Sequence, residues 1–389
     1  MPMSDITLSK KQILIVEKLI DWFKASSQKY ITLGGYAGTG KTTLLGYLSK
    51  KLHNEKKNIK IAFCSYTGKA SRVLERKLRD VKSLDSDDFI GTIHRLIYRP
   101  IVDERDEIIG WEKVPTADFK YSLIVIDEAS MVTEDIWNDL LSFGIPILAV
   151  GDHGQLPPIN SEFNLMKKPE LKLEDIYRQE ASNPIIKISE MARREGRIPF
   201  DIFGKNIKKI HKEDEDTQEI LTDIFESFDE NTMVLCGYNS SRIKLNKGIR
   251  ALHFDKEIPQ VGDRVICLKN NRIENIFNGM MGNILDISKE KTHGFSYYET
   301  EIALDCEDYT FWGKISINQF NSPTLIDLKM REVNYFDFGY ALTVHKAQGS
   351  QAKRVVVFEE RFSKMDDESF ARWLYTAVTR AEKELIIVA

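Results

Sequence analysis

The sequence predicts an α/β protein with two doubly wound parallel-sheet domains. Three observations predict this class. The chain has 389 residues, which is longer than one hydrophobic core usually supports. Short, continuous apolar runs alternate with helical patterns in the first part of the chain, and a second set of the same kind lies toward its end. Hydrophobic residues make up 42% of the chain and charged residues 29%, as is typical of a globular protein.

The first predicted domain comprises residues 1–160. It opens with an amphipathic helix over residues 9–23, and a Gly-rich turn leads into a second helix that begins near Lys41. Four apolar or β-branched runs are the expected parallel strands: Tyr30–Leu33, Ile59–Phe63, Leu123–Ile126 and Ile147–Val150. A β-hairpin with DERD as its turn is expected as an insertion at about residues 97–116.

The second predicted domain comprises residues 161–261 and 339–389. Its expected strands are Thr232–Cys236, Arg354–Phe358 and Leu385–Val388, with helices near residues 241–252 and 368–380. Residues 262–338 have a different texture, in which short strand patterns are separated by Gly, Asn and Asp. This segment predicts a small antiparallel barrel inserted into the second domain.

Charge and cysteine content exclude several classes of site. The formal net charge is −4, with 55 Lys and Arg against 59 Asp and Glu, so a nucleic-acid site has to be a local groove. The cysteines are far apart and lack zinc-finger spacing, which predicts buried thiols in a reducing compartment: Cys64, Cys236, Cys267 and Cys306. No apolar run is long enough to span a bilayer, so we expect a cytoplasmic protein without membrane contact.

A phosphate-binding loop is predicted at residues 35–42. Gly35-Tyr-Ala-Gly-Thr-Gly40-Lys41-Thr42 fits GxxxxGK[ST], directly after an expected strand and at the start of an expected helix. Backbone N–H groups of such a loop converge on phosphates, Lys41 reaches the β- and γ-phosphates, and the Thr42 hydroxyl ligates Mg²⁺. The alternative is a Gly-rich turn that binds nothing, which the flanking strand and helix disfavour.

Two carboxylates follow a buried strand in Leu-Ile-Val-Ile-Asp127-Glu128. The carboxyl ends of strands in open α/β sheets are where ligands bind. Asp127 is the predicted Mg²⁺ partner, and Glu128 is the predicted base that orients and deprotonates the attacking water. A solvated turn or a helix cap is the alternative for this pair.

Further motifs resemble those of superfamily 1 helicases of the RecD-like and Dda-like group. The segments that carry the resemblance are Asp127–Met131, Gly151–Pro158, Ala341–Ser350 and Trp373–Ala381. The resemblance implies two RecA-like domains of the P-loop NTPase type, with a small hairpin in the first and a small SH3-like β-barrel in the second. It also implies ATP and Mg²⁺ as cofactors and translocation from 5′ to 3′.

The resemblance assigns nucleotide contacts residue by residue. Gln155 is expected to sense the γ-phosphate, and Arg178 and Arg380 to donate to it. Gln12 matches an adenine-reading glutamine, although Ser9-Lys-Lys-Gln12 is also a capping box, and the two roles do not exclude each other. The remaining expected nucleotide contacts are Gly35, Ala37, Gly38, Thr39, Gly40, Thr42, Thr43 and Gly349.

Nucleic-acid contacts are expected in both domains. In the first they are Thr67, Gly68, Lys69, Thr92 and His94, and in the second Asn239, Thr343, His345 and Lys346. Hydroxyls, helix-start N–H groups and lysines hold phosphates without reading bases, which suits a motor that accepts any sequence. Packing inside the protein is the alternative for each histidine. Trp111 and Ile108 are either a strand-separating wedge or packing residues of the hairpin.

These predictions combine into an ATP-dependent 5′-to-3′ DNA helicase. Its expected substrates are single-stranded DNA and single/double-strand junctions, with replication or recombination proteins as further candidate partners and a monomeric state. The alternatives are an ATP-gated single-strand-binding or remodelling translocase without strong unwinding, and an RNA helicase. No residue selects visibly for or against a 2′-hydroxyl. A phage-encoded chain would act in the host cytoplasm.

Overall fold

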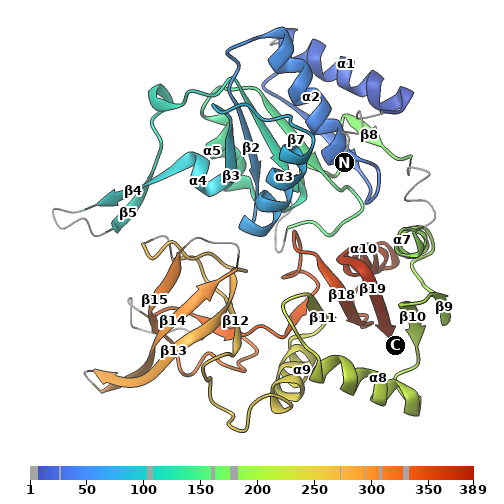
Figure 1. Cartoon of the computed structure of the whole chain (residues 1–389), viewed down its shortest axis with the longest axis vertical. Coiled ribbons are helices and arrows are strands. Elements are labelled where there is room, and N and C mark those ends of the chain that lie inside the picture. The colour runs from blue at the N-terminus through green and yellow to red at the C-terminus, as the bar shows by residue number, and fades with distance from the viewer. Residues whose placement is uncertain are drawn as a thin grey trace. The chain divides into compact units, whose positions relative to one another are not determined.

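The computed structural model describes residues 8–25, 28–102, 108–158, 163–175, 183–271, 273–292, 294–305, 309–326 and 333–389. The chain forms two compact units. The first comprises Met1–Ile101 and Trp111–Ile186, and the second comprises Val102–Gly110 and Lys187–Ala389. Each unit contains a six-stranded sheet, and the second also contains a five-stranded sheet (Figure 1).

The sheet of the first unit is parallel throughout, in the order β3-β2-β6-β7-β1-β8. Its strands are β1 (Tyr30–Gly35), β2 (Ile61–Ser65), β3 (Phe89–Thr92), β6 (Leu123–Asp127), β7 (Ile147–Gly151) and β8 (Leu171–Leu173). The four central runs predicted as buried strands all lie in it. Residues within these strands are apolar on both faces because helices cover both sides.

Alternate residues of the strands enter two separate cores. Phe63 and Val125 pack with α1 (Lys10–Ala25), α2 (Lys41–Glu55) and α3 (Gly68–Asp80). Cys64 and Ile126 pack on the other side with α4 (Ile93–Ile97) and α5 (Glu134–Leu141). Single-turn 3₁₀ helices lie at Thr116–Asp118 and Ala129–Met131. This two-sided cover is the doubly wound arrangement that the sequence predicts.

The boundary predicted at residue 160 lies too early. β8 pairs with β1 through Leu33↔Leu171 and Gly35↔Leu173, so residues beyond 160 complete the first sheet. With three residues and a single fully buried side chain, β8 carries too little pattern to be recognised in a sequence.

The predicted hairpin is present as a two-stranded ribbon of β4 (Tyr98–Val102) and β5 (Ile108–Lys113). Arg99 and Glu112 form an ion pair between the strands, with 2.8 Å between Nε and Oε1. At the base of the ribbon, the Tyr98 hydroxyl donates to Asp139 of α5. Trp111 is half-buried, whereas the DERD turn and the Ile108 side chain lie outside the described residues.

The main sheet of the second unit has the order β17-β11-β18-β19-β10-β9. Its strands are β9 (Asp201–Gly204), β10 (Ile207–Ile210), β11 (Thr232–Cys236), β17 (Ala341–Thr343), β18 (Ala352–Phe358) and β19 (Ala381–Val388). All neighbours are parallel except β9 and β10. The strands predicted from apolar runs form its centre, and the edge hairpin β9–β10 is an addition that the prediction lacks.

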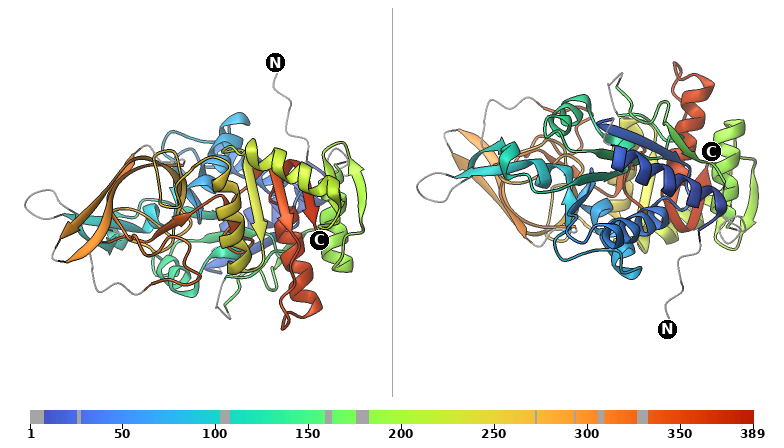
Figure 2. Two further views of the ribbon diagram at one scale, coloured as in Figure 1. Left: turned by 90° about the horizontal axis from the view of Figure 1, so that it is seen from below. Right: turned by 90° about the horizontal axis from the view of Figure 1, so that it is seen from above.

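Helices lie on both faces of this sheet as well (Figure 2). On one face α8 (Glu215–Glu226) and α9 (Asn239–Ala251) pack against Val234, Val356 and Ile386. On the other face α10 (Asp367–Val378) packs on β18 and β19. α7 (Pro184–Glu195) follows the passage from the first unit. The second unit is therefore also a doubly wound α/β layer.

Residues inserted between β11 and β17 form a five-stranded antiparallel sheet, β15-β14-β13-β12-β16. The strands are β12 (Arg264–Cys267), β13 (Met281–Thr292), β14 (Phe295–Leu304), β15 (Thr310–Ile315) and β16 (Phe336–Phe338). A bridge between Ile315 and Asn334 brings the end of β15 to the residues before β16, so the two edges of the sheet meet around an apolar core. The curvature is visible in Figure 2.

Cys64, Cys236 and Cys267 are buried free thiols, as predicted, and Cys306 lies outside the described residues. Burial raises the pKa of Cys236 and of Cys267 to about 12. Among the described residues, no cluster of three His, Cys, Asp or Glu side chains is arranged to hold a metal ion. No described helix combines the length and the apolar character that crossing a membrane requires.

Candidate nucleotide and nucleic-acid sites

Most of the predicted residues of the first unit lie at one edge of its sheet. Because the strands are parallel, their carboxyl ends lie together at this edge; the strands concerned are β1, β2, β3, β6 and β7. These ends carry the loop after Gly35, the start of α3 after Ser65, Thr92, the pair after Ile126, and the segment after Gly151. This is the edge at which open α/β sheets bind ligands.

Glycines give the loop after β1 its shape. Gly38 and Gly40 have φ of 77° and 75°, in the left-handed region that favours glycine. A Cβ at Gly35 would stand 2.7 Å from Thr39 Oγ1, so only glycine fits where the loop closes on itself. Thr39 stabilises the curl, since its hydroxyl donates to the Tyr36 carbonyl over 2.8 Å.

Lys41 begins α2 and folds back over the loop. Its ammonium donates to the carbonyl oxygens of Gly35, at 2.7 Å, and Tyr36, at 3.0 Å. The amino end of α2 adds the positive end of the helix dipole at the same place. The loop therefore concentrates positive charge and N–H groups as a phosphate site requires.

Gln12 closes the predicted capping box and also contacts the Gly-rich loop, while its role in reading an adenine stays a prediction. The Ser9 backbone N–H donates to Gln12 Oε1 over 3.1 Å and the Gln12 N–H to Ser9 Oγ over 3.2 Å, which is a complete capping box. Gln12 Nε2 also donates to the Thr39 carbonyl over 3.2 Å, and the side chain is buried. The start of α1 is thus hydrogen-bonded directly to the phosphate loop.

The two carboxylates lie at the end of β6. Burial raises the pKa of Asp127, while the charge of Lys41 lowers it, so the two side chains are electrostatic neighbours. The Glu128 N–H donates to Asp127 Oδ1 over 3.0 Å. Glu128 has φ of 56°, a left-handed conformation that is uncommon for a residue with a side chain and occurs often at functional sites.

The segment after β7 contacts the phosphate loop through an aromatic pair. The rings of His153 and Tyr36 are 4.2 Å apart between centroids. Asp152 holds the turn, because its carboxylate accepts from the Gly154 N–H at 2.9 Å and from Gln155 Nε2 at 3.4 Å. Burial lowers the pKa of His153 and favours the neutral ring. Sequence reasoning singled out Gln155 here and missed Tyr36, Asp152 and His153 as its surroundings.

Thr67 and Thr92 are helix caps. Thr67 accepts from the Ala70 N–H at 3.3 Å, and Thr92 accepts from the Arg95 N–H at 3.2 Å. Thr67 follows β2 and Thr92 ends β3, and these strands are parallel neighbours, so α3 and α4 both start at the same edge of the sheet. His94 is half-buried, with its ring 6.0 Å from that of Tyr66. Gly68 begins α3; the Lys69 side chain lies outside the described residues.

Arg380 of the second unit is buried, at 2% exposure. Its Nε donates to the Thr376 carbonyl at 3.0 Å, its Nη1 to the Ser350 carbonyl at 3.2 Å, and its Nη2 to Thr379 Oγ1 at 3.2 Å. Gly349, with φ of 72°, turns the chain beside Ser350. The structure therefore brings together Arg380 and the Gly349 segment. Arg178 lies outside the described residues.

The other predicted residues of the second unit follow β11 and β17. These strands are parallel neighbours, so Asn239 and Thr343 lie at the same edge, and the Val344 N–H donates to the Cys236 carbonyl over 3.1 Å. His345 and Lys346 are half-buried in the next turn. Burial lowers the pKa of His345 and lowers that of Lys346 to about 8.

Two residues that the sequence did not single out hold this edge together. Glu360 accepts from the N–H groups of Gly237, at 2.8 Å, and Tyr238, at 2.9 Å, and from the Ser241 hydroxyl. Arg242 donates through Nε to Asn239 Oδ1 over 3.3 Å. In a sequence, a single charged residue is usually interpreted as part of a solvated surface, so no pattern indicated the roles of Glu360 and Arg242.

Comparison with family profiles places most of these residues in known domains. Residues 7–215, more than half of the chain, match the profile described as an AAA domain. Residues 338–388 match the UvrD-like helicase C-terminal domain. The first match covers the phosphate loop and Asp127, and the second covers Lys346 and Arg380.

Curated relatives match over nearly the whole chain. The chain is 26% identical over 394 residues to the ATP-dependent RecD2 DNA helicase of Deinococcus radiodurans, which covers 96% of this chain and 48% of that protein. The chain thus spans about half the length of that relative. It is 23% identical over 461 residues to the ATP-dependent DNA helicase dda of Enterobacteria phage T4, with all of both chains covered.

Solved structures share the fold. The chain is similar to Pif1 helicase from Bacteroides in complex with ADP-AlF3 and ssDNA, with a TM-score of 0.54 at 18% identity, covering 99% of this chain and 92% of that one. Pif1 helicases at forked dsDNA give a TM-score of 0.55 at 17% identity. With its Gly-rich loop, two doubly wound sheets and both profile matches, the chain belongs to the AAA-domain family, and its motifs, its UvrD-like helicase C-terminal domain and its relatives identify it as a superfamily 1 helicase of the RecD-like and Dda-like group.

Proposed function

We propose that this chain is an ATP-dependent DNA helicase that translocates 5′ to 3′ on single-stranded DNA and unwinds the duplex ahead of it. The observation that carries the proposal is the phosphate loop, in which Lys41 folds onto the Gly35 and Tyr36 carbonyls as an electrostatic neighbour of Asp127. The relatives named as RecD2 and dda DNA helicases support DNA as the substrate. The polarity follows from the resemblance to their group.

In this proposal the first unit binds and hydrolyses ATP. The N–H groups of the loop hold the phosphates, and Lys41 exchanges its carbonyl partners for phosphate oxygens, which are stronger acceptors because they are charged. Glu128 orients and deprotonates the attacking water, and Gln155 responds to the γ-phosphate. Gln12 contacts the nucleotide from the start of α1. Its side-chain amide already donates to the Thr39 carbonyl in the loop.

Thr42 and Asp127 are the residues that would hold Mg²⁺. Both offer oxygen ligands, which is the donor set that Mg²⁺ prefers, and the charge of Asp127 suits a divalent cation. Bound Mg²⁺ would neutralise charge on the phosphates. Burial raises the pKa of Asp127, and the charge of Lys41 opposes that effect.

Arg178 and Arg380 are proposed to donate to the γ-phosphate. Three guanidinium N–H groups of Arg380 donate to the Thr376 carbonyl, the Ser350 carbonyl and the Thr379 hydroxyl, which fix the group in place. A guanidinium carries five N–H groups in a planar fork, so donors remain for a phosphate. Rigid attachment is what a charge-stabilising donor needs, because it then requires little reorganisation during the reaction.

Single-stranded DNA is proposed to contact both units. The helix starts capped by Thr67 and Thr92 offer N–H groups to phosphates, with Lys69 and His94 beside them. In the second unit the contacts are Asn239, Thr343, His345 and Lys346. ATP binding and hydrolysis then tighten and release the two contacts in alternation, which moves the strand in one direction.

The accessory parts have proposed roles as well. The β4–β5 ribbon acts as the strand-separating pin, with Trp111 in it. The closed five-stranded sheet is the SH3-like barrel of the group, supported by the bridge between its two edges. We propose that the protein acts as a monomer at single/double-strand junctions and that replication or recombination proteins are its further partners.

Unwinding of matched 5′-tailed and 3′-tailed DNA duplexes with ATP tests activity and polarity together. We expect the 5′-tailed duplex to be unwound, and Glu128→Gln to abolish unwinding while it retains ATP binding. Stimulated ATPase without unwinding would favour an ATP-gated translocase, and stronger stimulation by ribo-oligomers would favour an RNA helicase. An ATPase rate that is the same with and without any oligonucleotide would overturn the proposal.

A further inference from the structure

Helix α9 is fastened to the inserted sheet by two buried ion pairs of the same kind. Arg242 Nη1 lies 2.6 Å from Asp337 Oδ2, and Arg250 Nε lies 2.8 Å from Asp263 Oδ1. All four side chains are buried, with exposures of 4% and 1% in the first pair and 5% and 0% in the second. Asp337 belongs to β16 and Asp263 directly precedes β12.

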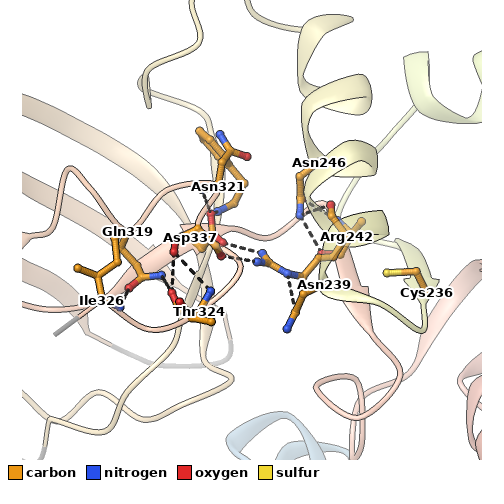
Figure 3. Close-up of polar contacts among 12 residues, drawn as sticks. Cys236, Asn239, Arg242, Asn246, Gln319, Asn321, Thr324, Ile326 and Asp337 are labelled. Carbon is orange, nitrogen blue, oxygen red and sulfur yellow. Dashed lines mark hydrogen bonds and ion pairs between the residues drawn. The ribbon is translucent and has the colours of Figure 1, made fainter. Parts of the chain in front are cut away.

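The two pairs differ in what else their arginines contact. Arg250 donates to the carbonyls of Lys256 and Ile258, in the chain that follows its own helix. Arg242 donates through Nη2 to the Ser322 carbonyl at 3.0 Å and through Nε to Asn239 Oδ1 at 3.3 Å (Figure 3). Only the first pair therefore joins the inserted sheet to a proposed DNA contact, among the bonds of the described residues.

Both carboxylate oxygens of Asp337 accept hydrogen bonds. Its Oδ1 accepts from the backbone N–H groups of Asn321 and Phe338, both at 2.8 Å, while Oδ2 accepts from Arg242. Gln319 shapes the same loop, since its side chain donates to the Thr324 carbonyl at 3.0 Å and accepts from the Ile326 N–H at 2.9 Å (Figure 3). The aspartate thus gives the Arg242 guanidinium a fixed partner, while Nε of the same group contacts Asn239.

The contact with Arg242 also decides which end of the Asn239 amide is presented. A guanidinium has only donors, so it engages the amide oxygen and leaves the NH₂ group directed elsewhere. Asn239 is exposed at the start of α9, and its NH₂ group is a donor that suits a phosphate or sugar oxygen. Without Arg242 the amide would be free to turn over.

The same pair acts on Lys346. The positive charge of Arg242 lowers the pKa of the Lys346 ammonium, and Asp337 opposes that effect. Arg242 and Asp337 are thus electrostatic neighbours of the second proposed contact at this edge. Arg250 and Asp263 do not act on it in this way among the described residues.

We propose that Arg242 and Asp337 are positioning residues for the single-strand contact of the second unit, in which they orient the Asn239 amide and set the charge environment of Lys346. This inference rests on the proposed function. Arg242 and Asp337 act through Asn239 and Lys346. The inserted sheet, through β16, is thereby part of the DNA contact even if none of its own side chains reaches the strand.

The matched pair provides the control. We would measure thermal unfolding, the maximal oligothymidine-stimulated ATPase rate and the oligothymidine concentration for half-maximal stimulation in Arg242→Lys, Asp337→Asn, Arg250→Lys and Asp263→Asn. Substitutions in either ion pair should lower the Tm of the protein by comparable amounts. Only Arg242→Lys and Asp337→Asn should raise the half-saturating concentration, by about fivefold, as expected when one hydrogen bond of typical net strength is lost. Maximal rates should stay within about twofold.

A double-mutant cycle with Asn239→Ala separates positioning from general loosening. If Arg242 acts through Asn239, adding Arg242→Lys to Asn239→Ala should change the half-saturating concentration by less than about twofold. Additive effects of the two substitutions, or equal effects of both ion pairs, would overturn the inference. An absence of stimulation in the unsubstituted protein would overturn the proposed function instead.

Discussion

At the scale of single residues, Lys41 gives the sharpest expectation. Its ammonium bridges two loop carbonyls, so the side chain is already placed where phosphate oxygens would bind. Lys41→Ala should lower the stimulated ATPase rate by about 100-fold or more, because it removes a charge aimed at the reacting phosphates. A steady-state ATPase assay checks this. A matched assay of Lys57→Gln, an exposed lysine between α2 and β2, should show no change.

Lys346 predicts how DNA binding depends on pH. Burial and Arg242 lower its pKa to about 8, with Asp337 and Cys267 acting in the opposite direction. Folding therefore favours the neutral amine, and this cost to stability is relieved as the pH rises above about 8. DNA needs the charged form, so oligonucleotide affinity should fall about five- to tenfold between pH 7 and pH 9.

Fluorescence anisotropy with a labelled oligothymidine measures that profile. Lys346→Arg stays protonated throughout the range and should bind with little pH dependence. A wild-type affinity that is flat from pH 7 to pH 9 would contradict a role for the Lys346 charge.

The sequence predicted the residues whose neighbours are close in the chain and missed those whose partners are distant. The Gly-rich loop before Lys41 and the Ser9–Gln12 capping box are local patterns. The capping box is confirmed, and phosphate binding by the loop stays a prediction. Arg242 and Asp337 are 95 residues apart, and Gln12 and Thr39 are 27 apart. No local pattern encodes such a contact, so it emerges only when the chain is folded.

At the scale of elements, the helix caps separate stability from binding. Thr67→Ala should destabilise the first unit by about 1 kcal/mol, since it leaves an N–H group at the start of α3 without its acceptor. Thr67→Ser keeps the hydroxyl and should retain stability and oligonucleotide affinity. Chemical denaturation and anisotropy on the same samples check both. An unchanged stability in Thr67→Ala would show that the cap contributes nothing.

Strands were predictable where they are continuous and buried on both faces, as β6 and β7 are. They were not where side chains are few or solvated. β8 has three residues. The distal half of β13 is exposed and charged, although β13 pairs with β14 out to Thr292↔Phe295, so this length exceeds the short strand patterns expected within residues 262–338. A long antiparallel pair is held by backbone hydrogen bonds and by packing of alternate side chains on one face. Amino-acid composition does not reveal either.

At the scale of the whole molecule, the net charge of −4 means that DNA binding must rest on a few local cations. The affinity for oligothymidine should therefore weaken with salt. Lys346→Gln should reduce the slope of log K against log salt by about 0.7, the value for one phosphate contact on a single strand. Titrations between low and moderate salt measure it. Lys57→Gln should leave the slope unchanged.

The organisation into two α/β units with an inserted antiparallel sheet was predictable because each part has its own apolar periodicity. The last passage between the units was not, because the edge strand β8 extends the first sheet past residue 160 and the first unit continues to Ile186. A boundary depends on which strand pairs with which, and that is a property of the assembled sheet.

The side-chain amide of Gln12 makes two hydrogen bonds: it accepts from the Ser9 N–H at the start of α1 and donates to the Thr39 carbonyl. A base bound by the remaining N–H group and lone pair of this amide would contact a side chain that already holds the beginning of the chain's first helix. Choice among nucleotides and local order at that helix end are consequently linked, and proteolytic sensitivity there would report which base is present.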